Sequence, residues 1–218
     1  MGSGNMMMRG ILFDLDNTLI DRDAAMRRAV TRCLGVDAED AIDEVLAHDD
    51  SGFAERRAFF GWLAFRHPVF GGDARAAWKT LADGMRHAIE PDTAANDLID
   101  ALATDYRLAL VTNGGSATQR HKLRRSGLDR RFEHIFISEE VGCKKPQAGI
   151  FENALRALDC SPDNAIFVGD NPMADVAGAA AVGMRTCWVA RGRDYPASCP
   201  QPTWTVQHVA RLSEVLAC

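Results

Sequence analysis

The sequence lacks the features that would place the protein in a membrane or on a nucleic acid. No apolar run reaches the roughly 20 residues that a membrane-spanning helix needs, so we expect no membrane partner. The formal net charge of −5 offers no basic footprint, which argues against a nucleic acid polymer as partner. Residues 1–8 have neither a basic start nor a long apolar core. They look like a scar of recombinant cloning, not a signal peptide.

The cysteines and histidines lack the spacings that are typical of metal sites. The six cysteines form no Cys-X-X-Cys pair and are spread over the whole chain. This distribution predicts free thiols in a reducing cytoplasm, with no zinc site and no disulfide framework. The six histidines show no His-X-X-X-His or His-X-His spacing, so we expect surface or satisfied histidines and not metal ligands.

Beyond residue 92, strand-like and helix-like stretches alternate. Short apolar runs predict buried strands, and longer stretches with helical spacing predict the helices between them. The alternation predicts an α/β fold with a doubly wound, Rossmann-like parallel sheet. The expected strands are 10–13, 108–112, 134–137, 165–168 and 185–189, the expected helices are 93–103, 116–126, 147–158, 173–181 and 206–216, and 195–202 is a loop.

Between the first strand and residue 91 the sequence predicts helices alone. Apolar residues recur at helical spacing in four stretches, 23–34, 38–48, 52–66 and 73–89. We therefore expect a small helical cap domain over 21–90, inserted into a core made of 9–20 and 91–218. The aromatic residues of 52–66 could line a substrate pocket, but a small bundle is expected to bury them in its own core.

Asp14 and Asp16 end the first expected strand. Because successive side chains of a strand alternate between its two faces, residues two apart point to the same side. Burying two carboxylates together is costly, so the pair needs a cation or the solvent-facing end of the sheet. A cluster of oxygen ligands suits Mg²⁺. The alternative is an ordinary strand exit in which Asn17 or Thr18 caps a helix.

Thr112 and Asn113 end a second strand and are followed by Gly114 and Gly115. A hydroxyl, an amide and backbone N–H groups freed by glycine suit a phosphate oxygen at a helix N-terminus. The same four residues would also make an ordinary turn.

Two further strand ends carry charged residues. Lys145, held beside a proline, could place a fixed positive charge against a phosphoryl group or an aspartate, or it could belong to a surface lysine pair with Lys144. Asp170 could complete a metal shell, with Asp175 orienting it or the lysine. Alternatively, Asp170 caps a helix that has Pro172 in its first turn. Since ligands of such sheets bind beyond the carboxyl ends of the strands, all these ends are expected to meet.

Taken in order, these segments resemble the motifs of the haloacid dehalogenase (HAD) superfamily, from about Arg9 to the last helix. The matching residues are Asp14-Leu15-Asp16-Asn17-Thr18-Leu19, Val111-Thr112-Asn113-Gly114, Lys145-Pro146, and Gly169-Asp170 with Asp175.

The resemblance implies a role for each matching residue. Asp14 would be the nucleophile that becomes an aspartyl-phosphate, and Asp16 would serve as acid and then as base. Thr112 and Lys145, with the backbone of Asn113, would hold the phosphoryl oxygens. The Mg²⁺ ligands would be the Asp14 carboxylate, the Asp16 backbone carbonyl and Asp170, supported by Asp175 in the surrounding shell.

The residue at position 16 favours one chemistry within the superfamily. Dehalogenases attack carbon and lack an acid there, whereas Asp16 favours phosphoryl transfer. We therefore expect Mg²⁺-dependent hydrolysis of a small phosphorylated metabolite, such as a nucleotide or sugar phosphate, with the helical insertion acting as a lid. A phosphomutase on the same scaffold and a non-catalytic binding protein of the same fold are the alternatives. The sequence leaves a monomer and a homodimer equally open.

Overall fold

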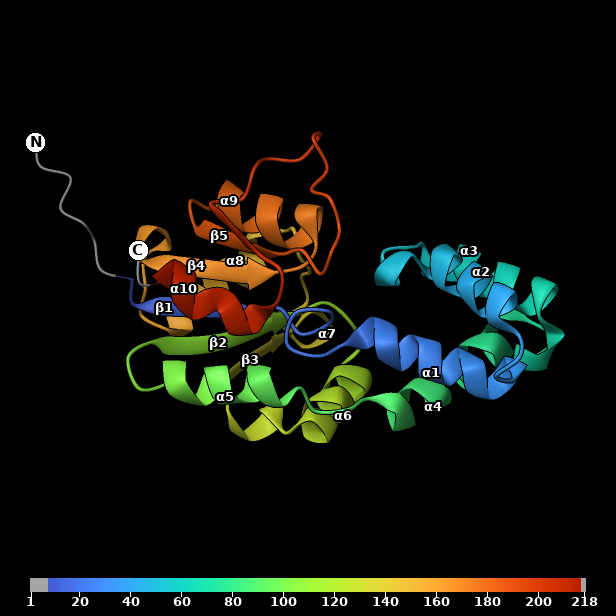
Figure 1. Cartoon of the computed structure of the whole chain (residues 1–218). Coiled ribbons are helices and arrows are strands. Elements are labelled where there is room, and N and C mark those ends of the chain that lie inside the picture. The colour runs from blue at the N-terminus through green and yellow to red at the C-terminus, as the bar shows by residue number, and fades with distance from the viewer. Residues whose placement is uncertain (1–7, 217–218) are drawn as a thin grey trace, which may run out of the picture. The chain divides into compact units, whose positions relative to one another are not determined.

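The computed structural model describes residues 8–216 of the chain. Two compact units are present. One contains the chain up to Ile20 together with the chain from Pro91 onward, and the other is Asp21–Glu90. The first carries the sheet and the second is helical, and each is described here by itself (Figure 1).

A six-stranded parallel sheet forms the centre of the first unit. Its strands are β1 (Gly10–Phe13), β2 (Arg107–Thr112), β3 (His134–Ile137), β4 (Ala165–Gly169), β5 (Arg185–Val189) and β6 (Trp204–Val206). Their order across the sheet is β3-β2-β1-β4-β5-β6, and all neighbouring pairs are parallel. The chain therefore switches direction across the sheet at β1, which has β2 on one side and β4 on the other. The predicted α/β, Rossmann-like fold class is confirmed.

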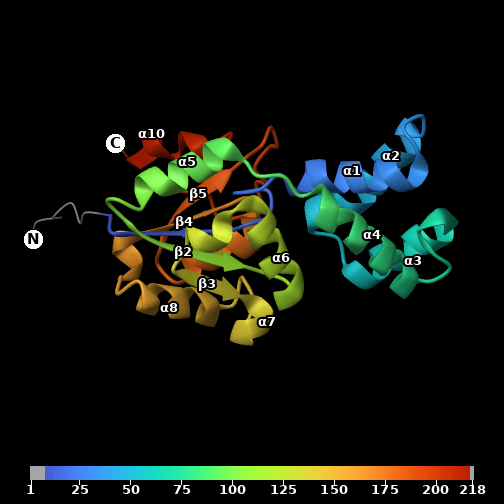
Figure 2. The same cartoon turned by 90° about the horizontal axis from the view of Figure 1, so that it is seen from below.

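Helices cover both faces of this sheet. They are α5 (Thr93–Leu102), α6 (Ser116–Ser126), α7 (Ser138–Val141), α8 (Ala148–Ala157), α9 (Gly178–Ala181) and α10 (Leu212–Leu216). Figure 2 shows α8 on one side of the sheet and α5 with α10 on the other. On the α8 side, Phe151 and Leu155 of the helix pack against Leu12, Val111 and Phe167 of the strands, and all five side chains are buried. Burying both faces explains why the strands read as continuous apolar runs.

In the C-terminal part the sequence analysis missed one strand, and one expected helix was wrong. Residues 204–206 form the short edge strand β6, and the expected helix over 206–216 is replaced by a 3₁₀ turn at Val209–Arg211 followed by α10. The cause is His208, whose ring nitrogen accepts the N–H of Ala210 and so caps a helical turn that starts at Val209, three residues after the predicted start. Across residues 8–216, no helix combines the length and apolarity that crossing a membrane requires.

The second unit contains four helices, namely α1 (Arg22–Leu34), α2 (Glu39–Asp49), α3 (Arg56–Arg66) and α4 (Ala74–Ala88). The third begins four residues later than the sequence predicted, because the Glu55 carboxylate caps it by accepting the N–H groups of Arg57 and Ala58. Phe59 and Phe60 are buried with Leu63 in this unit's own core, as expected, whereas Phe53 is exposed.

A buried ion pair holds the helical unit together. Asp49, at the end of α2, is 1% exposed, and Arg22 from the start of α1 donates to both of its carboxylate oxygens. Arg56 adds two bonds of 3.1 and 3.0 Å to Asp49 Oδ1. Arg56 is therefore tied to the fold, although its side chain is 44% exposed.

We predict that Asp49→Asn destabilises the helical unit by about 3–5 kcal/mol, because the substitution removes the buried carboxylate that Arg22 and Arg56 share and leaves Arg22 only its contact with the more exposed Asp23. Asp43→Asn is the matched control on the same helix. Asp43 pairs with Arg27 at a site where both side chains are at least half exposed, so its loss should cost under about 1 kcal/mol. Urea unfolding followed by tryptophan fluorescence measures both, and equal losses would contradict the assignment.

Candidate active site

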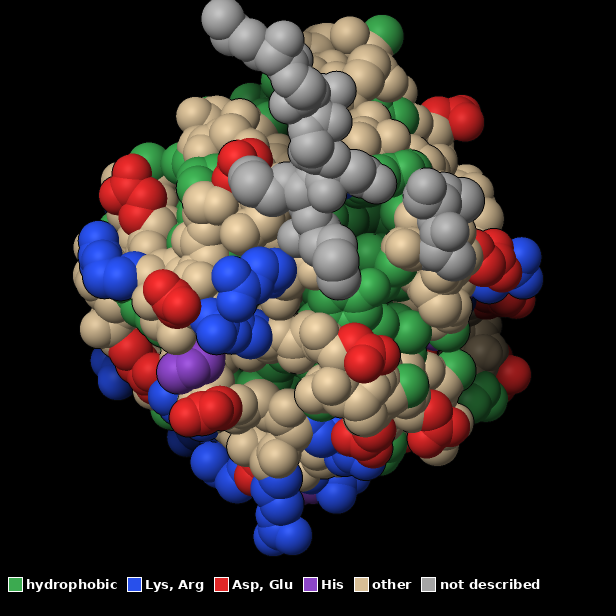
Figure 3. Space-filling view, turned by 90° about the vertical axis from the view of Figure 1, so that its left-hand side faces the viewer, with side chains coloured by type: hydrophobic (Ala, Val, Ile, Leu, Met, Phe, Trp, Pro, Cys, Tyr) green, Lys and Arg blue, Asp and Glu red, His purple; other side chains and the backbone are tan. Residues whose placement is uncertain are grey.

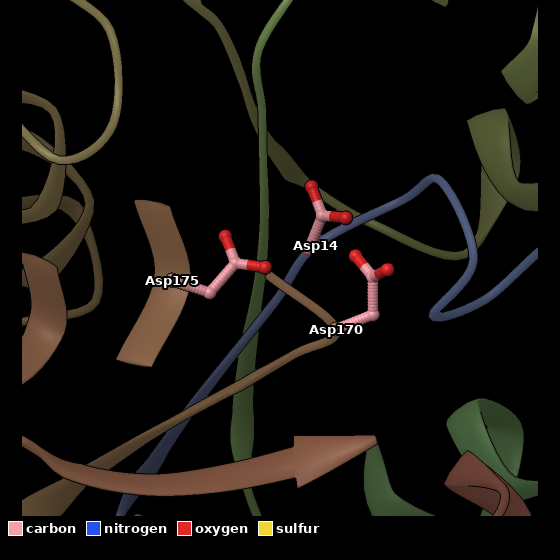
Figure 4. Close-up of side chains that lie close together, drawn as sticks. All are labelled: Asp14, Asp170 and Asp175. Carbon is pink, nitrogen blue, oxygen red and sulfur yellow. The ribbon is translucent and has the colours of Figure 1, made fainter. Parts of the chain in front are cut away.

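The carboxyl ends of β1, β2 and β4 lie side by side and bring the predicted residues together. Asp14 follows β1, and Asp170 follows β4. Asp175 comes from the π-helical turn Pro172–Ala177. Carboxylate oxygens of these three residues all lie within 4.8 Å of one another. Figure 4 shows the three side chains converging from their separate segments.

A tight turn after β1 fixes the first pair of acids. The carbonyl oxygen of Leu15 accepts the N–H groups of Leu19 and Ile20 at 3.0 and 3.1 Å. Asn17 adopts a left-handed conformation with φ of 56°, which asparagine tolerates better than most residues. The helix-cap alternative for Asn17 and Thr18 was wrong, since the carboxylate of Asp21 caps α1.

Lys145 is the cation of this cluster. Its Nζ lies 2.6 Å from Asp14 Oδ1 and 2.7 Å from Asp175 Oδ1. The side chain is 2% exposed, whereas the neighbouring Lys144 faces solvent. The surface-pair alternative is therefore wrong for Lys145. Its burial lowers the pKa of the Lys145 ammonium, but Asp14 and Asp175 outweigh burial and raise that pKa above its ordinary value.

Asn113 fixes the backbone that carries Lys145. Its side-chain amide donates to the Lys145 carbonyl and its Oδ1 accepts the Lys145 N–H, both at 2.9 Å. On the other side of the same peptide, Pro146 packs against Gly178, where an added Cβ would lie 2.9 Å from Pro146 Cα and Cβ. The two hydrogen bonds of the Asn113 side chain and the lack of a side chain at Gly178 therefore position the loop.

Two residues of α6 that the sequence analysis missed contact the site: Gln119 joins Thr112 to Asp16, and Lys122 bonds to Asp16. Gln119 Nε2 donates to Thr112 Oγ1 at 2.7 Å and to Asp16 Oδ2 at 3.0 Å. Lys122 Nζ lies 2.6 and 2.8 Å from the two Asp16 oxygens. The one signal that could have indicated them is their spacing. Residues three apart on a helix share a face, and α6 begins directly after the Gly114-Gly115 turn.

The glycine-rich turn before α6 does not offer all the N–H groups that the sequence suggested for a phosphate. The Gly114 N–H bonds to Ser138 Oγ at 2.9 Å, and the Ser116 N–H bonds to Glu139 Oε2 at 2.7 Å. Residues of β3's end and α7 therefore already satisfy these donors. The predicted phosphate contacts of Thr112, Asn113 and Lys145 stay predictions.

Asp170 is held from the loop after β5. Arg193 lies 3.0 Å from its Oδ2, and both Arg193 and the Trp188 indole donate to its backbone carbonyl. Asn171, and not Asp170, caps the following turn by accepting the N–H groups of Met173 and Ala174. The cap alternative for Asp170 was therefore wrong. Neither residue stands out in sequence, because the contact of Arg193 depends on how the loop after β5 folds back and that of Trp188 on the pairing of β5 with β4.

Asp175 packs against the backbone of the β4 end. Its Oδ2 accepts the Asn171 N–H at 2.9 Å. An added Cβ at Gly169 would lie 2.4 Å from this carboxylate, so only glycine leaves room for it. One carboxylate oxygen of Asp175 accepts the Asn171 N–H and the other pairs with Lys145. Asp175 is therefore placed to orient the lysine.

The cluster carries more negative charge than its cations balance. Three buried carboxylates pair with Lys145 and Arg193 within the described part of the chain. Burial raises the pKa of Asp14; Lys145 lowers it, but the Asp175 and Asp16 carboxylates raise it again, to about 7. Burial, then Asp14 and Asp175, raise the pKa of Asp170 well above its usual range, and Arg193 lowers it only in part. An all-oxygen cluster with uncompensated negative charge fits a divalent cation such as Mg²⁺.

A cavity of about 430 Å³ lies at the opposite edge of the sheet and contains none of these residues. Arg107, Leu108 and His134 line it at the amino ends of β2 and β3. Arg107 is already paired with Asp159. Figure 3 looks onto this side of the molecule and shows acidic and basic side chains interspersed, without a large area of one sign. The charged chemistry of the core is thus concentrated at the carboxyl edge.

A family model for haloacid dehalogenase-like hydrolases matches residues 8–183. The chain belongs to this family.

Individual relatives agree with that assignment. Phosphoserine phosphatase of Thermus thermophilus is 33% identical over 225 residues, covering 85% of this chain and 90% of the relative. Glyceraldehyde 3-phosphate phosphatase of Pyrococcus abyssi is 31% identical over 200 residues, covering 86% and 83%. The solved structure of the HAD-hydrolase YfnB of Bacillus subtilis, bound to magnesium, has the same fold, with a TM-score of 0.80 at 24% identity and coverage of 97% of this chain and 100% of that one. At the level of enzyme class, the predicted HAD-type phosphoric monoester hydrolase is confirmed.

We predict that Gly178→Ala lowers phosphate release roughly 10- to 100-fold without changing any charged residue. The new methyl group would displace Pro146 and with it Lys145, and a shift of about 1 Å at a reacting centre can cost about 10²-fold in rate. Overpacking should also cost about 1–3 kcal/mol of stability. Gly149→Ala in α8 is the control, because its new Cβ would meet only the Cys143 sulfur, at an ordinary 3.4 Å. Steady-state kinetics and thermal unfolding measure both variants, and normal activity of Gly178→Ala would contradict the role of this packing.

Proposed function

We propose that the protein hydrolyses a small phosphate monoester in a Mg²⁺-dependent reaction, through a phosphorylated Asp14. The observation that carries the proposal is the buried group of Asp14, Lys145 and Asp170 at the end of β1 and β4, with 2.6 Å between Lys145 Nζ and Asp14 Oδ1. A carboxylate that must approach a phosphate dianion needs compensating positive charge around it, and this corner of the sheet is built to hold such charge.

The first step transfers the phosphoryl group to the enzyme. A carboxylate oxygen of Asp14 forms a bond to phosphorus while the bond from phosphorus to the ester oxygen breaks. Asp16 gives its proton to the departing oxygen, so that the product leaves as an alcohol. The ammonium of Lys145 and the hydroxyl of Thr112 hold the phosphoryl oxygens during this transfer.

The second step regenerates the enzyme. Asp16, now a carboxylate, takes a proton from a water molecule as that water attacks phosphorus. The bond from phosphorus to Asp14 breaks, inorganic phosphate leaves, and Asp14 and Asp16 return to their starting states. The same carboxyl group therefore acts once as acid and once as base.

The metal would be held by the carboxylates of Asp14 and Asp170 and by the backbone carbonyl of Asp16. When bound, Mg²⁺ would supply positive charge that offsets the repulsion between the carboxylate nucleophile and the phosphate. Asp175 would keep Lys145 in place from behind, since its two oxygens bond to Lys145 and to the Asn171 N–H. Arg193 would hold Asp170 in the same way.

A small phosphorylated metabolite is the proposed substrate. The two relatives described above are named for phosphoserine and glyceraldehyde 3-phosphate, both small phosphate monoesters, and this supports the same class for the present chain. We further propose that the helical unit, Asp21–Glu90, acts as the lid that selects the substrate.

We predict that the purified protein releases inorganic phosphate from members of a panel of nucleotides, sugar phosphates, phosphoserine and glyceraldehyde 3-phosphate. Release should stop with excess EDTA and return with added Mg²⁺, since the uncompensated carboxylates need the cation. It should need no added bisphosphate, which separates hydrolysis from a mutase reaction. A phosphate-release assay checks each point. If the protein turns over no substrate of the panel with Mg²⁺ present, the proposal is wrong.

Asp14→Asn is expected to lower phosphate release by at least about 10³-fold while the protein stays folded, because an amide cannot attack phosphorus. Asp163→Asn makes the same change of charge at an exposed turn of the same unit and should leave the rate unchanged. Circular dichroism establishes that both variants are folded. Activity of Asp14→Asn near that of Asp163→Asn would exclude Asp14 as the nucleophile.

A further inference from the structure

Gln119 is a buried amide whose two hydrogens point at two different residues of the site. It is 2% exposed, and its Nε2 lies 2.7 Å from Thr112 Oγ1 and 3.0 Å from Asp16 Oδ2. The amide nitrogen therefore faces both residues, and an amide N–H₂ group has two hydrogens to donate. Both amide hydrogens are then used, one on each partner.

This arrangement fixes the direction of the Thr112 hydroxyl. A hydroxyl group has one hydrogen to donate and two lone pairs that accept. Because Gln119 donates to Oγ1, the hydrogen of Thr112 is directed to a different acceptor. Thr112 is 1% exposed and ends β2 at the carboxyl edge of the sheet, where the phosphoryl oxygens would lie. Gln119 thereby sets the hydroxyl as a donor.

Lys122 also bonds to Asp16, the second residue that Gln119 contacts. Its Nζ bonds to both carboxylate oxygens of Asp16, at 2.6 and 2.8 Å, and its side chain is 12% exposed. Gln119 and Lys122 are three residues apart on α6 and therefore lie on one face of the helix. Together they fix the Asp16 carboxylate through three bonds to a rigid helix.

The turn before α6 lets Gln119 come this close. Gly114 has φ of 143°, and an added Cβ there would lie 3.1 Å from the Gln119 side chain. A side chain at Gly114 would thus press on the amide that joins Thr112 to Asp16.

We propose that Gln119 and Lys122 are positioning residues: Lys122 aims Asp16 at the leaving oxygen, and Gln119 aims Asp16 and the Thr112 hydroxyl together. The inference rests on the proposed function, since Asp16 must deliver a proton to the ester oxygen for its position to matter. The bond from phosphorus to that oxygen breaks as the proton arrives, so a misplaced carboxyl slows only the reactions that need the proton.

The test compares two leaving groups in single-turnover experiments. An alkyl phosphate that the wild-type protein hydrolyses needs protonation of its leaving oxygen, whereas 2,4-dinitrophenyl phosphate releases a stable anion and does not. Lys122→Met keeps the length and packing of the side chain and removes its charge. Rapid quenching measures the rate of alcohol or phenol release in the first turnover, in the presence of Mg²⁺.

For Lys122→Met we expect a loss of roughly 10- to 100-fold in first-turnover rate with the alkyl phosphate and of about threefold or less with the dinitrophenyl ester. Inhibition by inorganic phosphate should be unchanged, since Thr112 keeps its partner. Lys122→Arg should recover part of the alkyl rate because it restores a donor to Asp16. Equal losses with both esters, or no loss with either, would overturn the role of Lys122.

Gln119→Leu removes both bonds of the amide at similar volume. We expect the same dependence on the leaving group and, in addition, inhibition by inorganic phosphate that is weaker by about tenfold, because the Thr112 hydroxyl is no longer aimed. Unchanged inhibition by phosphate would overturn the role of Gln119 in orienting Thr112.

Arg124→Met is the matched control. It removes a positive charge from an exposed position of the same helix and should change neither rate nor inhibition. Thermal unfolding of every variant separates a folding defect from a misplaced side chain, because a partly unfolded sample loses activity on both esters equally. The wild-type protein separates a failure of the proposed function from a failure of the positioning roles. If it hydrolyses neither ester with Mg²⁺, the proposed function fails, and if it hydrolyses both while the variants match it, only the positioning roles fail.

Discussion

Three carboxylates share one buried corner of the sheet with Lys145 and Arg193, and the contacts around them hold that concentration of negative charge in place. Lys145 lies 2.6 Å from Asp14 and 2.7 Å from Asp175, although it comes from a loop far along the chain. Asn113 hydrogen-bonds to the backbone of this loop, and the lack of a side chain at Gly178 leaves space for Pro146. Such a cluster would destabilise the fold if it were left unpaired, so most nearby contacts either add a donor or hold one in place.

The same excess charge connects the fold to its chemistry. A corner that is short of positive charge suits a divalent ion, and in the proposed reaction an ion beside Asp14 would allow a phosphate to approach. The topology contributes by placing β1 between β2 and β4, which gathers the ends of three strands at one edge. At that edge each site residue has its own neighbour. Asp175 pairs with Lys145, Arg193 pairs with Asp170, and Lys122 of α6 bonds to Asp16.

The sequence predicted those parts of the fold and site that depend on local pattern. Apolar runs marked the strands β1 to β5, and the acid, hydroxyl and lysine positions stood at strand ends where topology would unite them. It missed what depends on long-range packing. Gln119 and Lys122 read as polar residues of an ordinary surface helix, and the short strand β6 at Trp204–Val206 is too brief to leave a periodic signal. The N–H groups of the Gly114 turn seemed free for phosphate only because the side chains of α7 that bind them lie more than twenty residues away.

The central claim is that the Asp14 carboxylate takes the phosphoryl group before water does. The most direct measurement is an acid quench of the first turnover with a ³²P-labelled substrate and Mg²⁺, followed by mass-spectrometric mapping of the labelled peptide. The account predicts acid-stable label that rises and decays with the first turnover and lies on the peptide that contains Asp14. Label on another residue, or full product release without any labelled protein at the earliest times, would contradict it.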